Sequence, residues 1–290
     1  MKRLLAVFLL NLLLLTYALA NDPLYSPVLK RGSHKGTSID TDHWRYASAV
    51  PEDKVLALQK LTEPFEKEGI TYAGFGNLRH KGKWYFAAYP NRAEGASLLE
   101  EHFESTFPAA HSFVWVKYTS KAPVVILPEG EGESEKIYDL FISSEAARPK
   151  GVNYSLLRGT PVYSDFVLVH GIYSLKEILD TRAKNKDKTI EEFPLKLDPT
   201  QSARIVAAGV FMSRRDGYQR AYNTVSLSNC HGASLEMIDK GHGRYSLYRQ
   251  GRILSDTVGE VYPIFASFAL KARGIYNRKL NFFDSNRIGK

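Results

Sequence analysis

The chain is poor in cysteine: its 290 residues contain only one, Cys230, in the stretch SLSNCHGASLEMID. A single cysteine cannot form a disulfide within its own chain, so the thiol is a buried apolar group, an intermolecular crosslink or a group kept for chemistry. Zinc-binding patterns of the C-x-x-C or H-E-x-x-H kind are also missing. Cys230, His231 and His242 are three candidate ligands, but the first two are adjacent. We therefore expect no metal site and no cofactor.

The sequence also lacks an apolar run of the roughly 20 residues that a membrane-spanning helix needs. Its longest run, residues 4–15, is interrupted by Asn11, follows Lys2 and Arg3, and precedes small residues at positions 18 and 20. This pattern predicts a signal peptide over residues 1–20 that is cleaved near Ala20. No cysteine follows the run directly, so a lipid-anchored N-terminus is not expected. The predicted product is periplasmic or secreted.

A dense basic cluster is a third missing feature. The net charge is +8, and removal of Lys2 and Arg3 with the signal peptide lowers it to +6. The basic residues are scattered, which argues against a nucleic-acid partner and is compatible with peripheral contact with an anionic membrane surface. The hydrophobic content of 44% is that of a globular chain able to form its own core.

Hydrophobic periodicity and turn residues predict an α+β chain. We expect a lead-in and mostly helical segment over residues 21–104, and a domain that carries the thiol, with a C-terminal extension, over residues 105–290. The capping box formed by Asp198 and Gln201, with Pro199 at the first helical position, is the clearest local signal. The expected helices are 52–68, 94–104, 173–185, 199–213, 230–240 and 258–272. The expected strands are 70–76, 83–90, 111–118, 123–128 and 162–171, and a hairpin is expected over 243–254.

Asn229 is a good N-cap, which would place Cys230 in the first turn of a helix. Unpaired amides and the positive end of the helix dipole stabilise a thiolate there, and the same amides can hold an oxyanion. Such a nucleophile also needs an imidazole from a neighbouring strand. His111 opens the strand HSFVWVKY and is the best candidate. His231 is a poor one, because adjacent helical residues point about 100° apart.

Five segments carry a resemblance to a known family: AAHSFVWVKY, GVNYSLL, VLVHGIYS, LKLDPTQSARIVAAGVFM and YNTVSLSNCHGASLEMID. Together they are similar to the periplasmic domain found at the N-terminus of the Lnb-type lipoprotein N-acyltransferases, over roughly half of the mature chain. The resemblance implies a circularly permuted papain-like (NlpC-type) domain with a small antiparallel sheet packed on the cysteine helix. It assigns Cys230 as nucleophile, His111 as its base and Asn153 as the residue that orients the imidazole, with His170 as an alternative. His231 departs from the family, which tends to carry a small or hydroxyl residue there.

The sequence therefore predicts an exported cysteine-dependent acyl-transfer enzyme with a Cys-His dyad. Its substrate would be an amide or ester of a cell-envelope lipid, lipoprotein or peptide, and hydrolysis and transfer to an amine both stay open. The alternative is a non-catalytic periplasmic module that binds lipid, peptide or wall polymer through the same cleft.

Overall fold

The computed structural model describes residues 27–66, 69–103, 110–153, 163, 165–181, 188–223, 229–243, 266–276 and 281–283. The predicted signal peptide, residues 244–254 of the expected hairpin and the first part of the expected helix 258–272 lie outside these residues. Within them, no helix combines the length and the hydropathy that crossing a bilayer requires.

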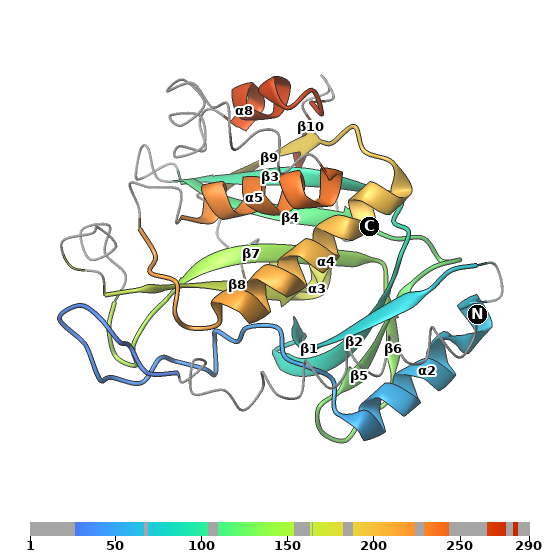
Figure 1. Ribbon diagram of the computed structural model, residues 1–290, viewed down its shortest axis with the longest axis horizontal. Coiled ribbons are helices and arrows are strands. Elements are labelled where there is room, and N and C mark those ends of the chain that lie inside the picture. Colours follow the sequence, from blue (N-terminus) through green and yellow to red (C-terminus); the bar gives the residue numbers. More distant parts are fainter. Residues whose placement is uncertain are drawn as a thin grey trace.

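The described elements form one mixed sheet with helices on both faces (Figure 1). The helices are α2 (Glu52–Glu66), α3 (Leu175–Thr181), α4 (Pro199–Asp216), α5 (Cys230–His242) and α8 (Ala266–Ala272). The strands are β1 (Tyr72–His80), β2 (Lys83–Pro90), β3 (Gly95–Phe103), β4 (Ala110–Lys117), β5 (Val124–Pro128), β6 (Glu135–Ile137), β7 (Asp139–Ala147), β8 (Val167–Tyr173), β9 (Lys188–Pro194) and β10 (Asn281–Phe283).

The sheet contains the ten described strands in the order β10-β9-β3-β4-β7-β8-β1-β2-β5-β6. Neighbouring strands are antiparallel, except that β1 runs parallel to β8. The α+β class is thus confirmed, but the sheet is larger than the small antiparallel one expected. Residues 72–103 supply three of its strands, so the N-terminal segment is not mostly helical. The expected boundary at residue 104 falls between β3 and β4, which pair with each other.

Two sequence-based elements need correction. Residues 95–103 form β3 and not a helix, although Ala, Leu and Glu favour helices. Pairing with β4 on one side and β9 on the other decides the conformation here. The expected strands 111–118 and 123–128 exist as β4 and β5. Although they follow each other in the chain, they do not pair: β4 pairs with β3 and β7, and β5 pairs with β2 and β6.

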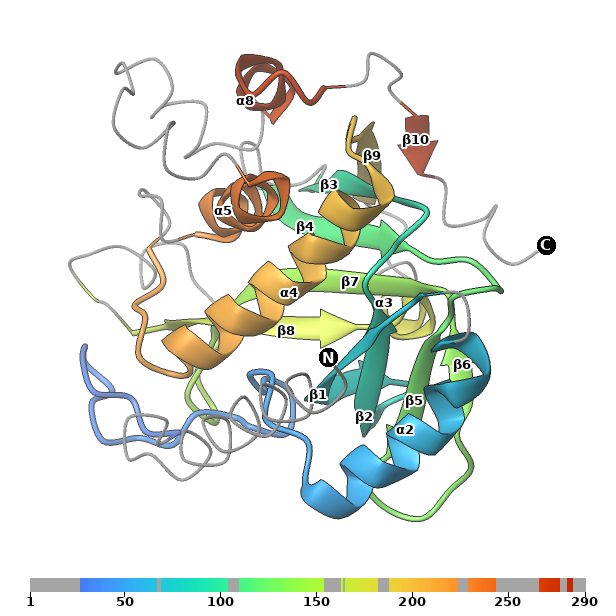
Figure 2. The same ribbon diagram turned by 45° about the vertical axis from the view of Figure 1, so that its right-hand side comes forward.

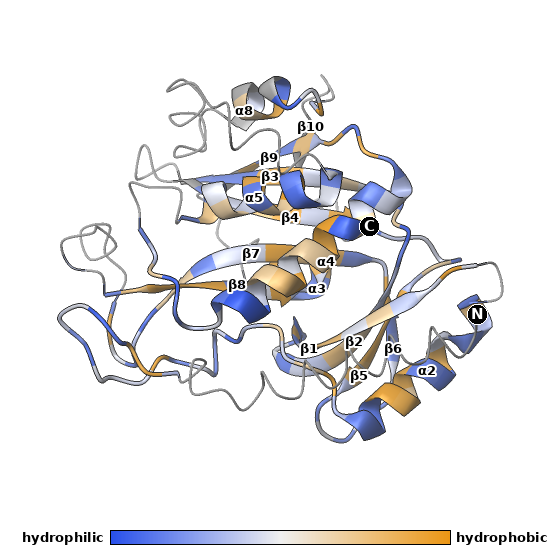
Figure 3. Cartoon of the chain, in the orientation of Figure 1, coloured by the Kyte–Doolittle hydropathy of each residue, from blue (hydrophilic) through white to orange (hydrophobic). Residues whose placement is uncertain are grey.

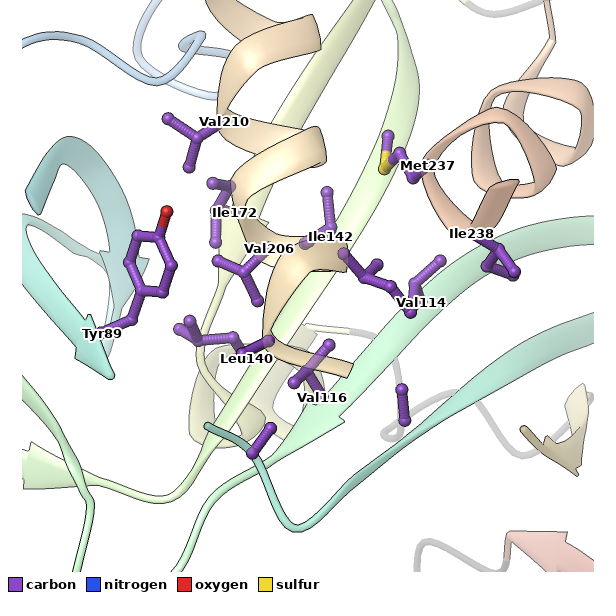
Figure 4. Packing of buried hydrophobic residues seen from close by; sticks show 14 of the residues in the cluster. Tyr89, Val114, Val116, Leu140, Ile142, Ile172, Val206, Val210, Met237 and Ile238 are labelled. Atoms are coloured by element: carbon purple, nitrogen blue, oxygen red, sulfur yellow. The ribbon is translucent and has the colours of Figure 1, made fainter. Parts of the chain in front are cut away.

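The helices α4 and α5 cover one face of the sheet, and α2 and α3 cover the other (Figure 2). Side chains of β2 show the division: Tyr89 packs in the cluster with α4, whereas Phe86 packs with Leu58 of α2. Figure 3 shows both hydrophobic and hydrophilic residues along α2, as expected of a helix with one buried side. In the core under α4 and α5, Val206 and Met237 lie among strand side chains such as Val114 (Figure 4).

Both local helix signals on this face are confirmed. Asp198 accepts a hydrogen bond from the Gln201 amide at 2.7 Å, and the Gln201 side chain accepts one from the Asp198 amide at 3.0 Å. The helix α4 begins at Pro199 and ends at Asp216. The helix α5 begins at Cys230, directly after the cap residue Asn229. Local sequence therefore fixes where both covering helices start.

The contact between α4 and α5 depends on a glycine. A Cβ atom at Gly241 would lie 2.9 Å from the backbone nitrogen of Ile205, closer than real Cβ contacts come. We expect Gly241→Ala to lower the free energy of unfolding by about 1–3 kcal/mol, because the two helices would have to separate. Gly95→Ala, where no atom lies within 4 Å of the added carbon, is the control. Equal urea unfolding midpoints for the two variants would contradict the close packing.

Candidate functional site

The thiol lies where the sequence places it, in the first turn of α5. The Asn229 side chain accepts a hydrogen bond from the Gly232 amide at 2.8 Å, which makes Asn229 the N-cap. Cys230 is a free cysteine with 5% of its surface exposed. One turn later, Ala233 packs with Phe166 and Leu168 at the start of β8. The thiol is therefore buried at a capped helix N-terminus, and residues 224–228 before it are outside the described part.

A buried polar cluster holds the first turn of α5 on the sheet. The Nδ1–H of His231 donates to Glu100 Oε1 on β3 at 3.0 Å and to Ser112 Oγ on β4 at 2.9 Å. The Ser112 hydroxyl donates to the second carboxylate oxygen of Glu100 at 2.7 Å, and Ser234 donates to the Ser112 carbonyl at 3.3 Å. The side chains of His231 and Glu100 are fully buried. The imidazole of His231, the residue that follows Cys230, thus meets a carboxylate and a hydroxyl of the sheet.

His111, the expected base, lies on the other face of the sheet. Its Nε2–H donates to Ser143 Oγ at 2.6 Å, and the Ser143 hydroxyl donates to Glu145 at 2.6 Å. The imidazole also stacks on Phe113, which packs with Ile178 of α3. Alternate residues of a strand face opposite sides, so His111 shares the face of α3.

The neighbour of His111 on β4 shows the opposite orientation. Ser112 points to α5, where it meets His231. The structure therefore does not bring His111 and Cys230 together as the predicted dyad requires. His111 lies on a strand as predicted, but its side chain faces α3, because one residue along a strand reverses the face.

Asn153, the expected third member, is exposed in the loop after β7 and next to residues outside the described part. No hydrogen bond between Asn153 and His111 is recorded among the described residues. The imidazole of His111 is oriented instead by Ser143 and Glu145 of β7.

His170, the alternative partner, lies on the same sheet face as α5 in a network of its own. Its Nδ1 accepts from the Ser144 hydroxyl at 2.7 Å, and its Nε2–H donates to Asp216 at 3.0 Å. Asp216 also receives hydrogen bonds from Arg215 and Arg220, and these two arginines contact Glu236 of α5. The network therefore joins β7, β8, α4 and α5.

The pKa values in this network follow from burial and charge. Burial lowers the pKa of His170 and outweighs the opposing hydrogen bond to Asp216. For Asp216, burial alone would raise the pKa, but hydrogen bonds from His170 and Arg215 hold it below its ordinary value. His170 is consequently a neutral imidazole beside an ionised carboxylate.

We expect the free energy of unfolding to decrease as the pH falls below about 6.5. In the unfolded chain His170 binds a proton near that pH, whereas in the folded protein burial keeps it neutral, so acid favours the unfolded state. Burial also lowers the pKa of His80, which acts in the same direction. Urea unfolding of the protein and of His170→Gln between about pH 8 and 5.5 measures the effect. The substitution should reduce the slope against pH, and identical slopes would contradict this assignment.

The three residues considered for zinc do not converge. Cys230 and His242 are the first and last residues of α5, so their backbones are roughly 18 Å apart at the helical rise per residue. His231 is engaged by Glu100 and Ser112. Among the described residues, no group of three or more His, Cys, Asp or Glu side chains is arranged to hold a metal ion.

The sequence did not reveal the carboxylate partners of His231 and His111. Glu100 was assigned to a helix, so its place beside β4 could not be deduced, and Glu145 lies in a segment for which no strand was predicted. The available signal was period two in the stretch GASLLEEHF, where Leu98 and Glu100 face one side and Leu99 and Glu101 the other.

Comparisons of the chain with protein-family models, with curated proteins and with solved structures give no match. The assignment of function therefore rests on the residues and geometry described above.

Proposed function

We propose that the protein is an exported, cysteine-dependent acyl-transfer enzyme with Cys230 as its nucleophile. The observation that carries the proposal is the position of the free thiol in the first turn of α5, directly after the N-cap Asn229. A helix N-terminus favours the thiolate and provides amides for an oxyanion. The resemblance of the sequence to the Lnb-type family, with its circularly permuted papain-like fold, supports the same reading.

The proposed reaction needs few groups. The Cys230 thiolate attacks the carbonyl carbon of an amide or ester, and the amide of Cys230 donates to the developing oxyanion. The bond from this carbon to the nitrogen or oxygen of the leaving group breaks, and the leaving group takes a proton from water. Water or an acceptor amine then attacks the thioester and releases the thiolate. His111 has no role in this scheme, because it faces α3.

A small hollow near the start of β8 has room for about one water molecule, and we propose that the substrate approaches along this part of the surface. It is lined by Leu29, Lys30, Arg31, Phe166, Val167, Tyr218, Gln219 and Ala221. Phe166 also packs against Ala233, one turn after Cys230. Lys30 and Arg31 give the hollow a basic rim, which suits the anionic groups of envelope lipids or peptides. We propose an acyl or amide compound of the envelope as the substrate.

The second candidate function is a non-catalytic periplasmic module that binds a lipid, peptide or wall polymer on this part of the surface. The low exposure of Cys230 favours it, because an enclosed thiol can be a packed apolar residue. In this case the chemistry of Cys230 would have no part in the function.

Alkylation of Cys230 separates the two functions. If the thiol is activated, iodoacetamide should modify it in the folded protein at about pH 6, where an ordinary thiol is almost fully protonated. Peptide mass mapping identifies the site, and circular dichroism shows that the protein is still folded. A thiol that reacts only after denaturation would exclude the enzyme and favour the binding module.

A further inference from the structure

The hollow at the start of β8 contains a side-chain donor that has no acceptor. Gln219 lines the hollow, and its amide nitrogen Nε2 is buried without a hydrogen-bond partner among the described residues. A buried donor that lacks an acceptor is costly, so such a group calls for an acceptor from water or from a ligand. The neighbouring hydroxyl of Tyr218 is already engaged, since it donates to the Trp44 carbonyl at 3.0 Å.

Two exposed cations line the same hollow. Lys30 and Arg31 both belong to its wall, and within the described part of the chain neither side chain contacts a carboxylate. Unpaired cations are ordinary on a protein surface when they stand alone. Here they lie beside an unpaired donor, so three groups that favour an oxygen anion share one site.

The remaining walls and the surroundings carry little that would oppose an anion. Leu29 packs with Val167 and Tyr218, which makes the inner wall apolar, and none of the lining residues carries a carboxylate. Asp165, which precedes the lining residues of β8, is directed to Ser33 instead. The Ser33 amide and hydroxyl donate to its carboxylate at 2.7 Å and 2.8 Å. The negative charge nearest in sequence is therefore already bound.

The backbone that carries the two cations is fixed in place. The Leu29 amide donates to the Thr37 carbonyl at 2.9 Å, and the Gly36 amide donates to the Leu29 carbonyl at 2.8 Å. Leu29 itself is buried in the core cluster next to β8. Lys30 and Arg31 follow this anchor directly, so little backbone entropy would be lost when they bind a ligand.

We propose that the hollow binds a terminal phosphate group, with one oxygen next to the Gln219 amide and the others at Lys30 and Arg31. The space for about one water molecule is also the space for one oxygen atom. A phosphate monoester then keeps two oxygens for the two cations, whereas a carboxylate keeps only one. Arginine binds two phosphate oxygens with its fork of donors, and lysine acts as a point charge.

This inference rests on the proposed function for one point, the identity of the substrate as an acyl compound that carries phosphate. The binding of phosphate itself involves no atom of Cys230. It can therefore be measured separately from the chemistry of the thiol.

The test is an NMR titration of the protein with glycerol 3-phosphate. The side-chain amide resonances of Gln219, assigned from their absence in Gln219→Met, should shift and saturate with a Kd of about 1 mM. Arg31→Gln should weaken binding about tenfold, and Lys30→Gln should weaken it severalfold, because each removes a charged donor. Titration with acetate should shift the same resonances far less.

The matched control is Lys35→Gln. Lys35 lies on the same turn and is exposed, but it does not line the hollow, so its loss removes the same charge without removing a proposed contact. The affinity of this variant should equal that of the parent protein. Unshifted Gln219 resonances, or equal losses in Lys35→Gln and Arg31→Gln, would overturn the site. Equal affinity for acetate would overturn the choice of phosphate.

Vesicles identify the source of the phosphate. Sedimentation with phosphatidylcholine vesicles that contain phosphatidic acid, reduced by Arg31→Gln, would assign the phosphate to a lipid headgroup. Binding of glycerol 3-phosphate without sedimentation would assign it to a soluble ester. Iodoacetamide alkylation of native Cys230 separates this inference from the proposed function: phosphate binding with an unreactive thiol would overturn the enzyme alone. A reactive thiol without phosphate binding would overturn only the phosphate site.

Discussion

Replacing Cys230 with serine is expected to reduce the hydrolysis of p-nitrophenyl butyrate, in which p-nitrophenolate leaves and water accepts the butyryl group, by at least about 10³-fold. Serine keeps the shape of the side chain, but its hydroxyl is un-ionised at neutral pH, and the helix terminus cannot compensate. The circular dichroism spectrum should be unchanged and the urea midpoint should change only modestly, because one sulfur is exchanged for one oxygen and no other atom of the buried side chain is altered.

The matched comparison for this experiment is His111→Gln. The amide of glutamine can donate to Ser143 as Nε2 of His111 does. Because His111 lies on the face of α3, this variant should retain hydrolysis within about twofold, whereas a Cys-His dyad would make both substitutions similarly damaging and non-additive. Full activity of Cys230→Ser would exclude the thiol mechanism, and severe loss in a folded His111→Gln would show that His111 reaches the thiol after all.

Removing the carboxylate of Asp216 is expected to cause the largest loss of stability, about 3 kcal/mol or more. Asp216 is 8% exposed and binds His170, Arg215 and Arg220. Asp216→Ala would leave a buried imidazole N–H without its acceptor and would remove one of the two carboxylates that Arg215 and Arg220 share, the other being Glu236. Loss of a buried partner is more costly than the pair itself is stabilising, because the remaining group stays desolvated.

An exposed ion pair on another helix is the control for this variant. Lys176 contacts Asp180 at 2.6 Å on α3, with side chains 53% and 36% exposed. Asp180→Ala should cost no more than about 0.5 kcal/mol, because water screens such pairs. Urea unfolding at neutral pH measures both. Equal losses of unfolding free energy in the two variants would contradict a stabilising role for the network around Asp216.

The start of each covering helix could be predicted from sequence, because the determinants are local. Asp198 and Gln201 lie three residues apart, and the side chain of each bonds to the backbone of the other. At the start of α5, the Asn229 side chain accepts a hydrogen bond from the Gly232 amide, also three residues along. Helix capping involves neighbours in the chain, so the residue types alone reveal it. The N-cap at Asn229 therefore also predicted that Cys230 lies in the first turn of α5.

Sheet membership could not be predicted in the same way. The stretch around Glu100 has good helix formers, and only its pairing with β4 and β9 makes it a strand. The side of the sheet that His111 faces could not be predicted either. Ser112 beside it faces α5, and nothing in the local sequence distinguishes the two residues. Interactions between distant segments decide both questions.

The most direct test of the central claim is the intact mass of the protein after brief incubation with p-nitrophenyl butyrate and acid quenching. The account predicts an added butyryl group on Cys230, located by peptide mapping, removed by hydroxylamine as a thioester is, and missing in Cys230→Ser. Turnover of the ester with no adduct on Cys230, or with an adduct on another residue, would contradict the assignment of this thiol as the nucleophile.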